Sequence, residues 1–414
     1  MTLIKTSLLS FIATVVKLLA ALVINKAIAL YIGPSGLAVI GQFQNMLQLA
    51  MTASQGAINA GVTKYTAEIG ADTEELPALF STAFKISVTC SGVVGLLLII
   101  FSNYAATNFL NDSAYRYVFI TLGFTIVFYT LNSLLLSIIN GLKEVPIFIS
   151  INITQSIYSL IFTTVLIYFF GLKGALIALV TNQSVIFVFV LWKLRNHPVI
   201  KLHLFKEKFN KIFASKLGKY ALMSITAAIL GPVSHMIIRN HLGESFGWEA
   251  AGYWQAIWYI STMYLMVITT SLSIYYLPRL SEITNKGELR KELLSGYKII
   301  LPVVSLLALS MFALKDFIIL ILFSEDFQPM RELFLWQLVG DVLKITAWLL
   351  SYVMLAKAMT KSFMISEILA SCSFVLLAIL FTNNYGLIGI TYAFSLNYLL
   401  YLVLVFFLVR SKFI

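Results

Sequence analysis

The sequence predicts an all-α, polytopic membrane protein in which about twelve transmembrane helices form two pseudo-symmetric six-helix lobes. Hydrophobic residues make up 60% of the 414 residues and charged residues only 11%, whereas soluble domains are ~45–50% apolar and ~25% charged. Apolar runs of membrane-spanning length recur along the chain, and the longest polar stretch lies near its middle. The composition therefore excludes the soluble two- or three-domain protein that the length alone would allow.

Each predicted span follows from the length of an apolar run, because a helix needs about 20 mostly apolar residues to cross a bilayer. The twelve runs are 8–32, 37–63, 79–102, 117–139, 147–170, 174–192, 220–242, 250–276, 299–323, 332–356, 362–382 and 386–409. Helix-breaking residues such as Gly33-Pro34, Gly171 and Asn383-Asn384 separate them. The first run is longer than the apolar segment of a signal sequence, so we expect it to be a helix of the mature protein.

Lysine and arginine residues predict the orientation of the chain. With a cytoplasmic N-terminus, 21 of the 29 basic residues fall in cytoplasmic segments, four fall outside and four lie within spans. Basic residues favour the cytoplasmic side of a membrane, so both termini are predicted to be cytoplasmic. The formal charge of +11 then faces an anionic phospholipid membrane, and no nucleic-acid partner is expected.

The central polar stretch divides the chain. Residues 193–219 are predicted to be a basic cytoplasmic linker that joins an N-terminal lobe, residues 1–192, to a C-terminal lobe, residues 220–414. Each lobe holds six of the predicted helices.

A weak internal repeat indicates a duplication. Gln42 precedes Glu68 by 26 residues in the first half, and Gln255 precedes Glu282 by 27 residues in the second. Both pairs end at the predicted inner end of the second helix of their half. An even number of helices in each half makes the repeats parallel, related by an axis along the membrane normal.

The sequence does not indicate an enzyme. The loops show no cluster of a nucleophile with a base, no glycine-rich phosphate loop and no metal-ligand spacing. Cys90 and Cys372 lie in separate apolar runs, which indicates neither a disulfide framework nor a zinc site. We therefore expect a transporter without a metal or organic cofactor.

Charged side chains inside the apolar runs are the first candidates for function, because each costs at least ~2.5–3.5 kcal/mol at bilayer depth. They are Lys17, Lys26, His235, Arg239, Asp341, Lys344 and Glu367. His235 and Arg239 are four residues apart and share a helix face. Gln337, Asp341 and Lys344 form one helical stripe.

Each of these charges also has a simpler interpretation. Asp341 and Lys344 can neutralise each other, and Lys26 can extend along lipid to the membrane surface. His235 can be a hydrogen-bonded packing residue. Lys64, at the inner end of a helix, can be an interfacial anchor.

Rows of uncharged polar residues suggest a hydrated cavity. Gln44, Gln48, Gln55 and Asn59 fall on one face of the run 37–63. Asn152, Ser156, Ser159 and Thr163 do the same on the run 147–170. Carboxamides also hold helices together, which is the alternative for any one of them. Amides and hydroxyls suit sugars, and cations suit phosphate, so the two sets together suit an amphiphile that bears both.

The chain resembles the Wzx-type flippases of undecaprenyl-diphosphate-linked oligosaccharides, which serve O-antigen and enterobacterial common antigen. These belong to the multidrug/oligosaccharidyl-lipid/polysaccharide exporter superfamily. The segments that carry the resemblance are Gly33-Pro34-Ser35-Gly36-Leu37, Gly61-Val62-Thr63-Lys64-Tyr65, Tyr276-Leu277-Pro278-Arg279-Leu280-Ser281 and Trp336-Gln337-Leu338-Val339-Gly340-Asp341-Val342-Leu343-Lys344. The resemblance runs from the first predicted helix to the last.

The resemblance implies a protein of the bacterial inner membrane that works by alternating access around a cationic cavity. Lys17, Lys26, Lys64 and Arg239 are then the expected pyrophosphate-binding residues. The amide rows place Gln48, Gln55, Asn59 and Asn152 at the glycan. Coupling to a gradient of H⁺ or Na⁺ is implied, with Asp341, Lys344, Glu367 and His235 as candidates. A glycan polymerase and a chain-length regulator are implied partners.

Three alternatives fit the sequence less well, because the features that each needs are scarce or missing in it. A multidrug extruder of the same fold needs an acidic, aromatic cavity for organic cations. A membrane glycan polymerase, from a different class, needs a long outside loop with clustered arginines. A channel needs a repeated filter segment or a ring of like charge.

Overall fold

The computed structural model describes residues 3–70, 75–110, 112–197, 201, 205–357 and 359–413. Within these residues every regular element is helical. The chain divides into two compact units. The first, here called the first lobe, contains Met1–Ile32 and Ile40–Pro232, and the second lobe contains Gly33–Val39 and Val233–Ile414. One boundary therefore falls inside α8, which runs from Lys211 to Phe246.

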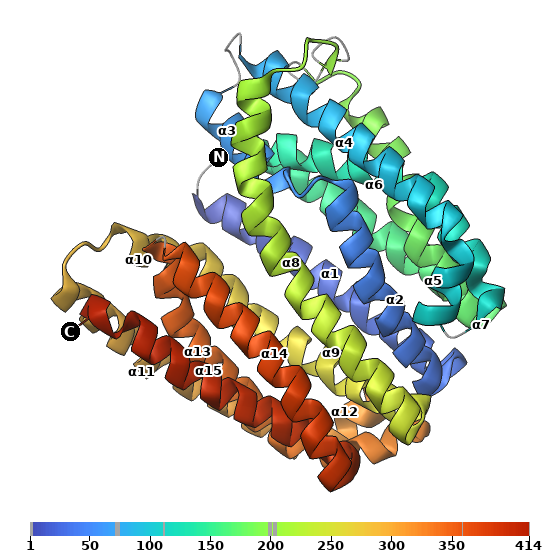
Figure 1. Cartoon of the computed structure of the whole chain (residues 1–414), viewed down its shortest axis with the longest axis vertical. Coiled ribbons are helices and arrows are strands. Elements are labelled where there is room, and N and C mark those ends of the chain that lie inside the picture. The colour runs from blue at the N-terminus through green and yellow to red at the C-terminus, as the bar shows by residue number, and fades with distance from the viewer. Residues whose placement is uncertain are drawn as a thin grey trace. The chain divides into compact units, whose positions relative to one another are not determined.

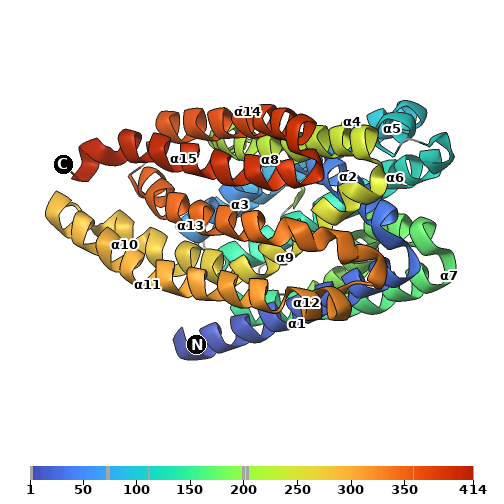
Figure 2. The same cartoon turned by 90° about the horizontal axis from the view of Figure 1, so that it is seen from below.

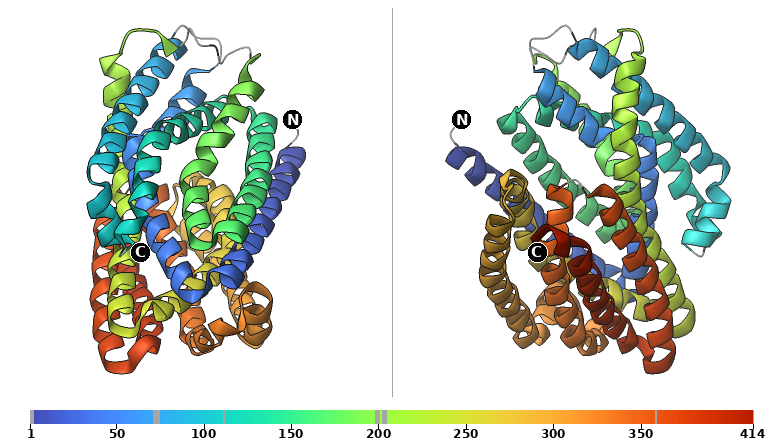
Figure 3. Two further views of the ribbon diagram at one scale, coloured as in Figure 1. Left: turned by 90° about the vertical axis from the view of Figure 1, so that its right-hand side faces the viewer. Right: turned by 60° about the vertical axis from the view of Figure 1, so that its left-hand side comes forward.

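The first lobe is built around α4, α6 and α7 (Figure 1). Its helices are α1 (Leu3–Tyr31), α2 (Gly33–Ser54) from Ile40 onward, α3 (Asn59–Ile69), α4 (Leu76–Ile100), α5 (Ser102–Phe109), α6 (Arg116–Gly141), α7 (Val145–Leu194) and the first part of α8. Gly171 interrupts the 50-residue α7 with φ 56° and ψ −131°, angles that glycine adopts with little cost. The reversal there divides α7 into two helices (Figure 3).

The second lobe follows from the later part of α8. Its helices are α9 (Trp248–Ser271), a π-helical turn (Leu272–Tyr276), α10 (Leu277–Glu282), α11 (Lys286–Ala313), α12 (Lys315–Leu322), α13 (Phe334–Ala356), α14 (Thr360–Tyr385) and α15 (Gly389–Phe413). In this lobe α15 lies between α13 and α14, and α11 packs against α13 (Figure 2).

Among the described residues, twelve long helices follow the order of the twelve predicted spans: α1, α2, α4, α6, the two halves of α7, α8, α9, α11, α13, α14 and α15. Seven described segments are long and apolar enough to cross a membrane. Two of them, Val145–Leu194 and Thr360–Arg410, each contain a pair of helices. The chain is thus a multi-pass membrane protein whose all-α fold confirms the prediction.

Some predicted boundaries were wrong. The run 37–63 is not one helix, because α2 ends at Ser54 and α3 begins at Asn59. Gly56 and Ala57 both have positive φ, 60° and 51°, so the backbone between these helices cannot continue helically. The helix predicted to begin near residue 220 begins earlier, because α8 starts at Lys211.

Pairs of helices approach closely at glycines. A methyl group at Gly95 of α4 would lie 2.5 Å from the Gly123 carbonyl oxygen of α6, and one at Gly123 would lie 2.7 Å from that of Gly95. In the second lobe, a methyl group at Gly252 of α9 would lie 2.0 Å from the Pro34 carbonyl oxygen. No larger residue fits at these three positions without movement of a backbone.

Candidate functional site

The polar stripe of α13 faces α9 inside the second lobe. Gln337 and Asp341 are fully buried. The Gln337 Nε2 donates a hydrogen bond to Ser261 Oγ at 3.2 Å. The Tyr264 hydroxyl donates to Asp341 Oδ2 at 2.8 Å. Two members of the predicted stripe therefore meet the polar side chains of one neighbouring helix.

The third member of the stripe, Lys344, is surrounded by aromatic rings. Its Nζ lies 4.9 Å from the ring centre of Trp348, 5.1 Å from that of Trp258 and 5.8 Å from that of Tyr398. All three distances permit a cation–π interaction. The ion pairs with N···O within 4.0 Å in the described part of the chain do not include Lys344 with Asp341. The aromatic rings, rather than a direct salt bridge, hold this ammonium.

The two charged residues of α8 contact the tryptophans of α9. The His235 ring packs edge-on against Trp258 with 4.2 Å between the ring centres, and lies 5.3 Å from Trp254. Arg239 is 1% exposed, and its Nη2 donates to Gln255 Oε1. Its guanidinium lies 5.5 Å from the Trp254 ring centre. His235 and Arg239 thus share one helix face, as their spacing predicts.

A second, half-buried carboxylate lies between α14 and α15. Glu367 Oε1 accepts a 2.6 Å hydrogen bond from the Tyr401 hydroxyl, which also contacts Ser351 Oγ at 3.2 Å. Tyr401 and Tyr398 have ring centres 6.2 Å apart. Aromatic residues therefore connect Glu367 to the ring cluster around Lys344.

These contacts form what we call the buried charge cluster: Arg239 and Asp341, which are buried, and His235, Lys344 and Glu367, which are half-buried. Both carboxylates accept a hydrogen bond from a tyrosine. Lys344 and Arg239 lie against aromatic rings. Charges at this depth are costly in lipid, which favours a role in binding or ion movement over a purely structural one.

The four residues expected to bind pyrophosphate lie on three helices, α1, α3 and α8. Lys17 is exposed and Lys26 is half-buried, both on α1. Lys64 is exposed on α3, where its Nζ lies 3.9 Å from the Glu68 carboxylate and 5.1 Å from the Tyr65 ring centre. Arg239, the fourth member of that set, belongs to the second lobe.

The predicted amide rows divide by environment. Asn59 Nδ2 donates to Gln55 Oε1 at 2.9 Å and to Ser133 Oγ of α6 at 2.7 Å. Asn152 Nδ2 donates to the Phe148 carbonyl at 2.8 Å within its own helix. Gln48 is exposed. Asn59 therefore makes the packing contact that is the alternative for any single amide, whereas Gln48 lies at the surface.

The aromatic partners in the cluster were missed by sequence reasoning. They are Trp254, Trp258, Tyr264, Trp348, Tyr398 and Tyr401. Trp254 and Trp258 are four residues apart, and Tyr398 and Tyr401 three apart, which places each pair on one helix face. In a chain with 31 Phe and 20 Tyr this spacing does not stand out from the membrane-facing aromatics.

Comparisons with known proteins agree along nearly the whole chain. The Lipid III flippases of Escherichia coli and Shigella flexneri are each 29% identical over 402 residues, covering 97% of this chain and 96% of theirs. The inward-facing structure of a multidrug resistance MATE family transporter of the MOP superfamily has a TM-score of 0.79 at 15% identity, covering 96% of this chain and 94% of its own.

The Lipid II flippase MurJ, in an inward closed conformation, has a TM-score of 0.73 at 17% identity, covering 99% of this chain and 89% of its own. The two lobes therefore have the fold of the MOP-superfamily transporters. The family of polysaccharide biosynthesis proteins matches residues 55–332. This chain belongs to that family.

Proposed function

We propose that this protein is a flippase that moves an undecaprenyl-diphosphate-linked oligosaccharide, an O-antigen or common-antigen repeat unit, from the cytoplasmic to the periplasmic leaflet. The observation that carries the proposal is the likeness to Lipid III flippases over 97% of the chain. The fold that it shares with a Lipid II flippase supports the same reaction class. The relatives named flippases are transporters, and this chain is a transporter rather than an enzyme.

The substrate has three parts that need different surroundings. Its diphosphate is attracted by cations, for which Lys17, Lys26, Lys64 and Arg239 are the candidates. Its sugars need hydrogen-bonding groups, for which the two predicted amide rows offer the exposed Gln48 together with Gln55, Asn59 and Asn152. Its polyprenyl tail stays in the bilayer while the head group crosses. Only the head group then has to leave the aqueous phase.

Coupling to an ion gradient is assigned to the buried charge cluster. Asp341 and Glu367 are the groups that can take up H⁺ or bind Na⁺, with Lys344 and His235 as neighbouring cationic or ionisable groups. Uptake of one positive charge by Asp341 changes the balance against Lys344 one helical turn away. Such a change favours one state of an alternating-access cycle over the other.

The compartment follows from the substrate. Lipid-linked oligosaccharides are assembled on the cytoplasmic face, so the protein acts in the bacterial inner membrane. A glycan polymerase and a chain-length regulator would use its product on the other side.

Transport in reconstituted vesicles tests the proposal. A labelled lipid-linked oligosaccharide is placed in one leaflet, and its appearance in the other is followed. Lys17→Ala and Arg239→Ala should each slow translocation, and exchange between Lys and Arg should be better tolerated because a point charge suffices. Lys286→Ala, at the exposed start of α11, is the matched control. Unchanged rates in both Lys17→Ala and Arg239→Ala would reject the assignment of these cations.

A multidrug extruder is the alternative, favoured by the TM-score of 0.79 to a MATE transporter. A strain that lacks the protein would then become drug-sensitive, whereas loss of a flippase leaves drug sensitivity unchanged and stops glycan export. A glycan polymerase would instead be recognised by altered polymer length with intact translocation.

A further inference from the structure

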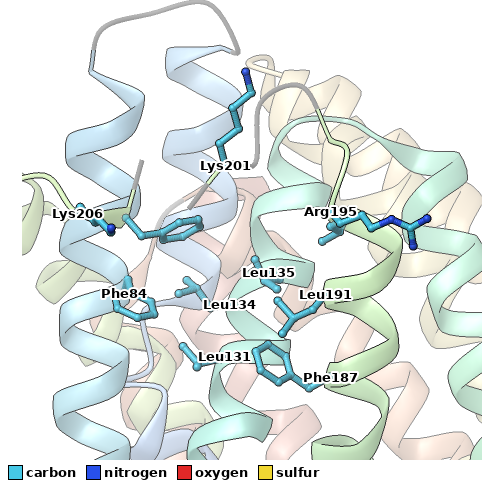
Figure 4. Close-up of a pocket in the computed structure, with 11 residues that line it drawn as sticks. Phe84, Leu131, Leu134, Leu135, Phe187, Leu191, Arg195, Lys201 and Lys206 are labelled. Carbon is cyan, nitrogen blue, oxygen red and sulfur yellow. The ribbon is translucent and has the colours of Figure 1, made fainter. Parts of the chain in front are cut away.

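A cavity of about 710 Å³ opens at one end of the first lobe, between α4, α6 and the second half of α7. Its walls are apolar, as Figure 4 shows. The residues that form them include Phe84 of α4, Leu131, Leu134 and Leu135 of α6, and Phe187 and Leu191 of α7. This volume falls within the ~300–1,000 Å³ typical of ligand pockets.

The chain after α7 returns to this cavity and is fixed there. Phe205 stacks on Phe80 with 5.8 Å between ring centres and contacts Phe84 at 5.7 Å. Ser81 Oγ donates to the Phe205 carbonyl at 3.1 Å. The backbone N–H of Asn210 donates to Thr82 Oγ1 at 3.0 Å. The wall at Phe205 is therefore held against α4 by rings and hydrogen bonds together.

The mouth of the cavity is basic. Arg195, Lys201 and Lys206 complete its lining and lie at one end of the apolar walls (Figure 4). The ion pairs within 4.0 Å in the described ranges include none of these three side chains. The Arg195 guanidinium instead lies 4.7 Å from the Trp192 ring centre. Residues 193–219 carry eight Lys or Arg and one acidic residue, Glu207, so the surroundings do not offset this charge.

We propose that this cavity, here called the basic-mouthed pocket, binds an anionic phospholipid of the cytoplasmic leaflet. The acyl chain occupies the apolar interior, and the phosphate lies at Arg195, Lys201 and Lys206. The charge distribution of the chain predicts that this end is cytoplasmic, where anionic lipids attract basic groups at about 1 kcal/mol per Lys or Arg. Basic pockets between membrane helices on this side are known to hold anionic head groups.

The apolar walls and the basic mouth of the pocket favour an anionic lipid over other ligands. Free inorganic phosphate does not suit an apolar cavity as the main ligand, because it does not bury the apolar surface of the walls. A zwitterionic lipid carries a cation beside its phosphate, so it offsets the three basic side chains less than an anionic lipid does. A bound lipid contacts α4, α6 and α7 at once, so it stabilises the folded lobe by an amount that rises with the logarithm of its concentration. This role is independent of transport.

Binding is tested on the full-length purified protein with phosphatidylglycerol, phosphatidylcholine and inorganic phosphate as separate probes. A phosphatidylglycerol with a photoreactive acyl chain should label peptides that contain Phe84, Leu131 or Phe187, and unlabelled phosphatidylglycerol should compete. Phosphatidylcholine and inorganic phosphate should compete poorly. At about fivefold for each cation removed, the triple variant Arg195→Gln/Lys201→Gln/Lys206→Gln should bind on the order of 100-fold more weakly.

Two matched controls separate effects at the pocket from general effects of lost charge or added bulk. Removal of the same number of exposed cations in Lys286→Gln/Lys291→Gln/Lys298→Gln should leave the labelling of these peptides unchanged. Leu191→Trp, which fills the pocket, should reduce labelling, whereas Val188→Trp, on the same helix but outside the pocket, should not. Equal competition by phosphatidylcholine, labelling insensitive to Leu191→Trp, or displacement by undecaprenyl diphosphate alone would each overturn the proposal.

Discussion

Tyr264 on α9 and Asp341 on α13 are joined by a 2.8 Å hydrogen bond inside the second lobe, where Asp341 has no exposed surface. The two residues are 77 positions apart in the sequence, so the bond exists only when α9 and α13 pack correctly. It links the fold of the lobe directly to the residue that we assign to ion coupling.

Removal of either partner should separate stability from coupling. Tyr264→Phe deletes a hydrogen bond to a buried acid, worth ~1.5–3 kcal/mol when the acid is charged, and should lower the melting temperature. Asp341→Asn keeps the shape and a hydrogen-bonding oxygen, so it should retain stability but abolish the response of transport to an imposed H⁺ or Na⁺ gradient. Thermal unfolding and vesicle transport measure the two effects.

Asp316→Asn is the matched control, because the Asp316 side chain is 55% exposed. It should leave the gradient response unchanged, and it should lower the melting temperature by no more than loss of the exposed 3.0 Å ion pair with Arg331 allows, ~0–1 kcal/mol. A gradient response that survives in Asp341→Asn would remove this residue from the coupling mechanism.

The amide rows should divide into packing and binding residues. Asn59→Ala removes both hydrogen bonds of the Asn59 amide group and leaves Ser133 without that donor, so it should cost ~1–3 kcal/mol of stability. Gln48→Ala changes an exposed side chain and should leave the melting temperature within experimental error. If Gln48 contacts the glycan, its loss should still slow transport. Melting curves and transport rates for both variants check this, and a slower rate in Asn59→Ala alone would speak against Gln48 as a sugar contact.

The close approach of Gly252 to Pro34 predicts a steric cost. Gly252→Ala places a methyl group 2.0 Å from a carbonyl oxygen, and overpacking of this kind typically costs ~1–3 kcal/mol. Gly92→Ala is the control, since its methyl group would meet nothing within 4 Å and alanine favours a helix by ~0.5–1 kcal/mol. The melting temperature should fall in the first variant and stay or rise in the second. Equal values would show that α9 can move away from Pro34.

His197 predicts a pH dependence of stability outside the membrane. It follows the end of α7, is 8% exposed and lies 3.9 Å from Glu144. Burial lowers the pKa of His197, and the nearby Glu144 carboxylate opposes this only in part. The folded protein therefore binds a proton less readily than the unfolded chain, whose histidine pKa is ~6.5. The contribution of neutral His197 to the free energy of unfolding is complete above that pH and is lost as the pH falls below it.

This effect is measured from melting temperatures at pH values between 7.5 and 5, spaced by about half a pH unit. The decrease on acidification should be smaller in His197→Gln than in the natural protein. It should be larger in Glu144→Gln, because the pKa of His197 then falls further. Identical pH profiles for all three proteins would contradict the burial argument.

The helices could be predicted because membrane helices depend on one strong signal, the length of an apolar run. The break between α2 and α3 could not be predicted, because Ala57 adopts a positive φ that is unusual for alanine. Gln55, Gly56 and Ala57 read as a continuous helix in sequence. Short helices such as α5 were missed for a related reason, since eight residues carry little periodicity.

The buried charge cluster was predicted in part. The spacing of Gln337, Asp341 and Lys344 gave the stripe, because helical periodicity is local. Its partners Tyr264 and Trp258 come from another helix, and no local rule relates them to α13. The hydrogen bond between Glu367 and Tyr401 likewise depends on how α14 packs on α15. Tertiary pairing of this kind is absent from any single apolar run.

The glycine contact between α4 and α6 has a mechanical consequence. Because neither Gly95 nor Gly123 leaves room for a methyl group, the two backbones interlock and cannot slide along each other without a clash. We therefore expect α4 and α6 to move together as one rigid pair in any conformational cycle. The changes in backbone angles should then occur at interruptions in neighbouring helices, such as Gly171 of α7.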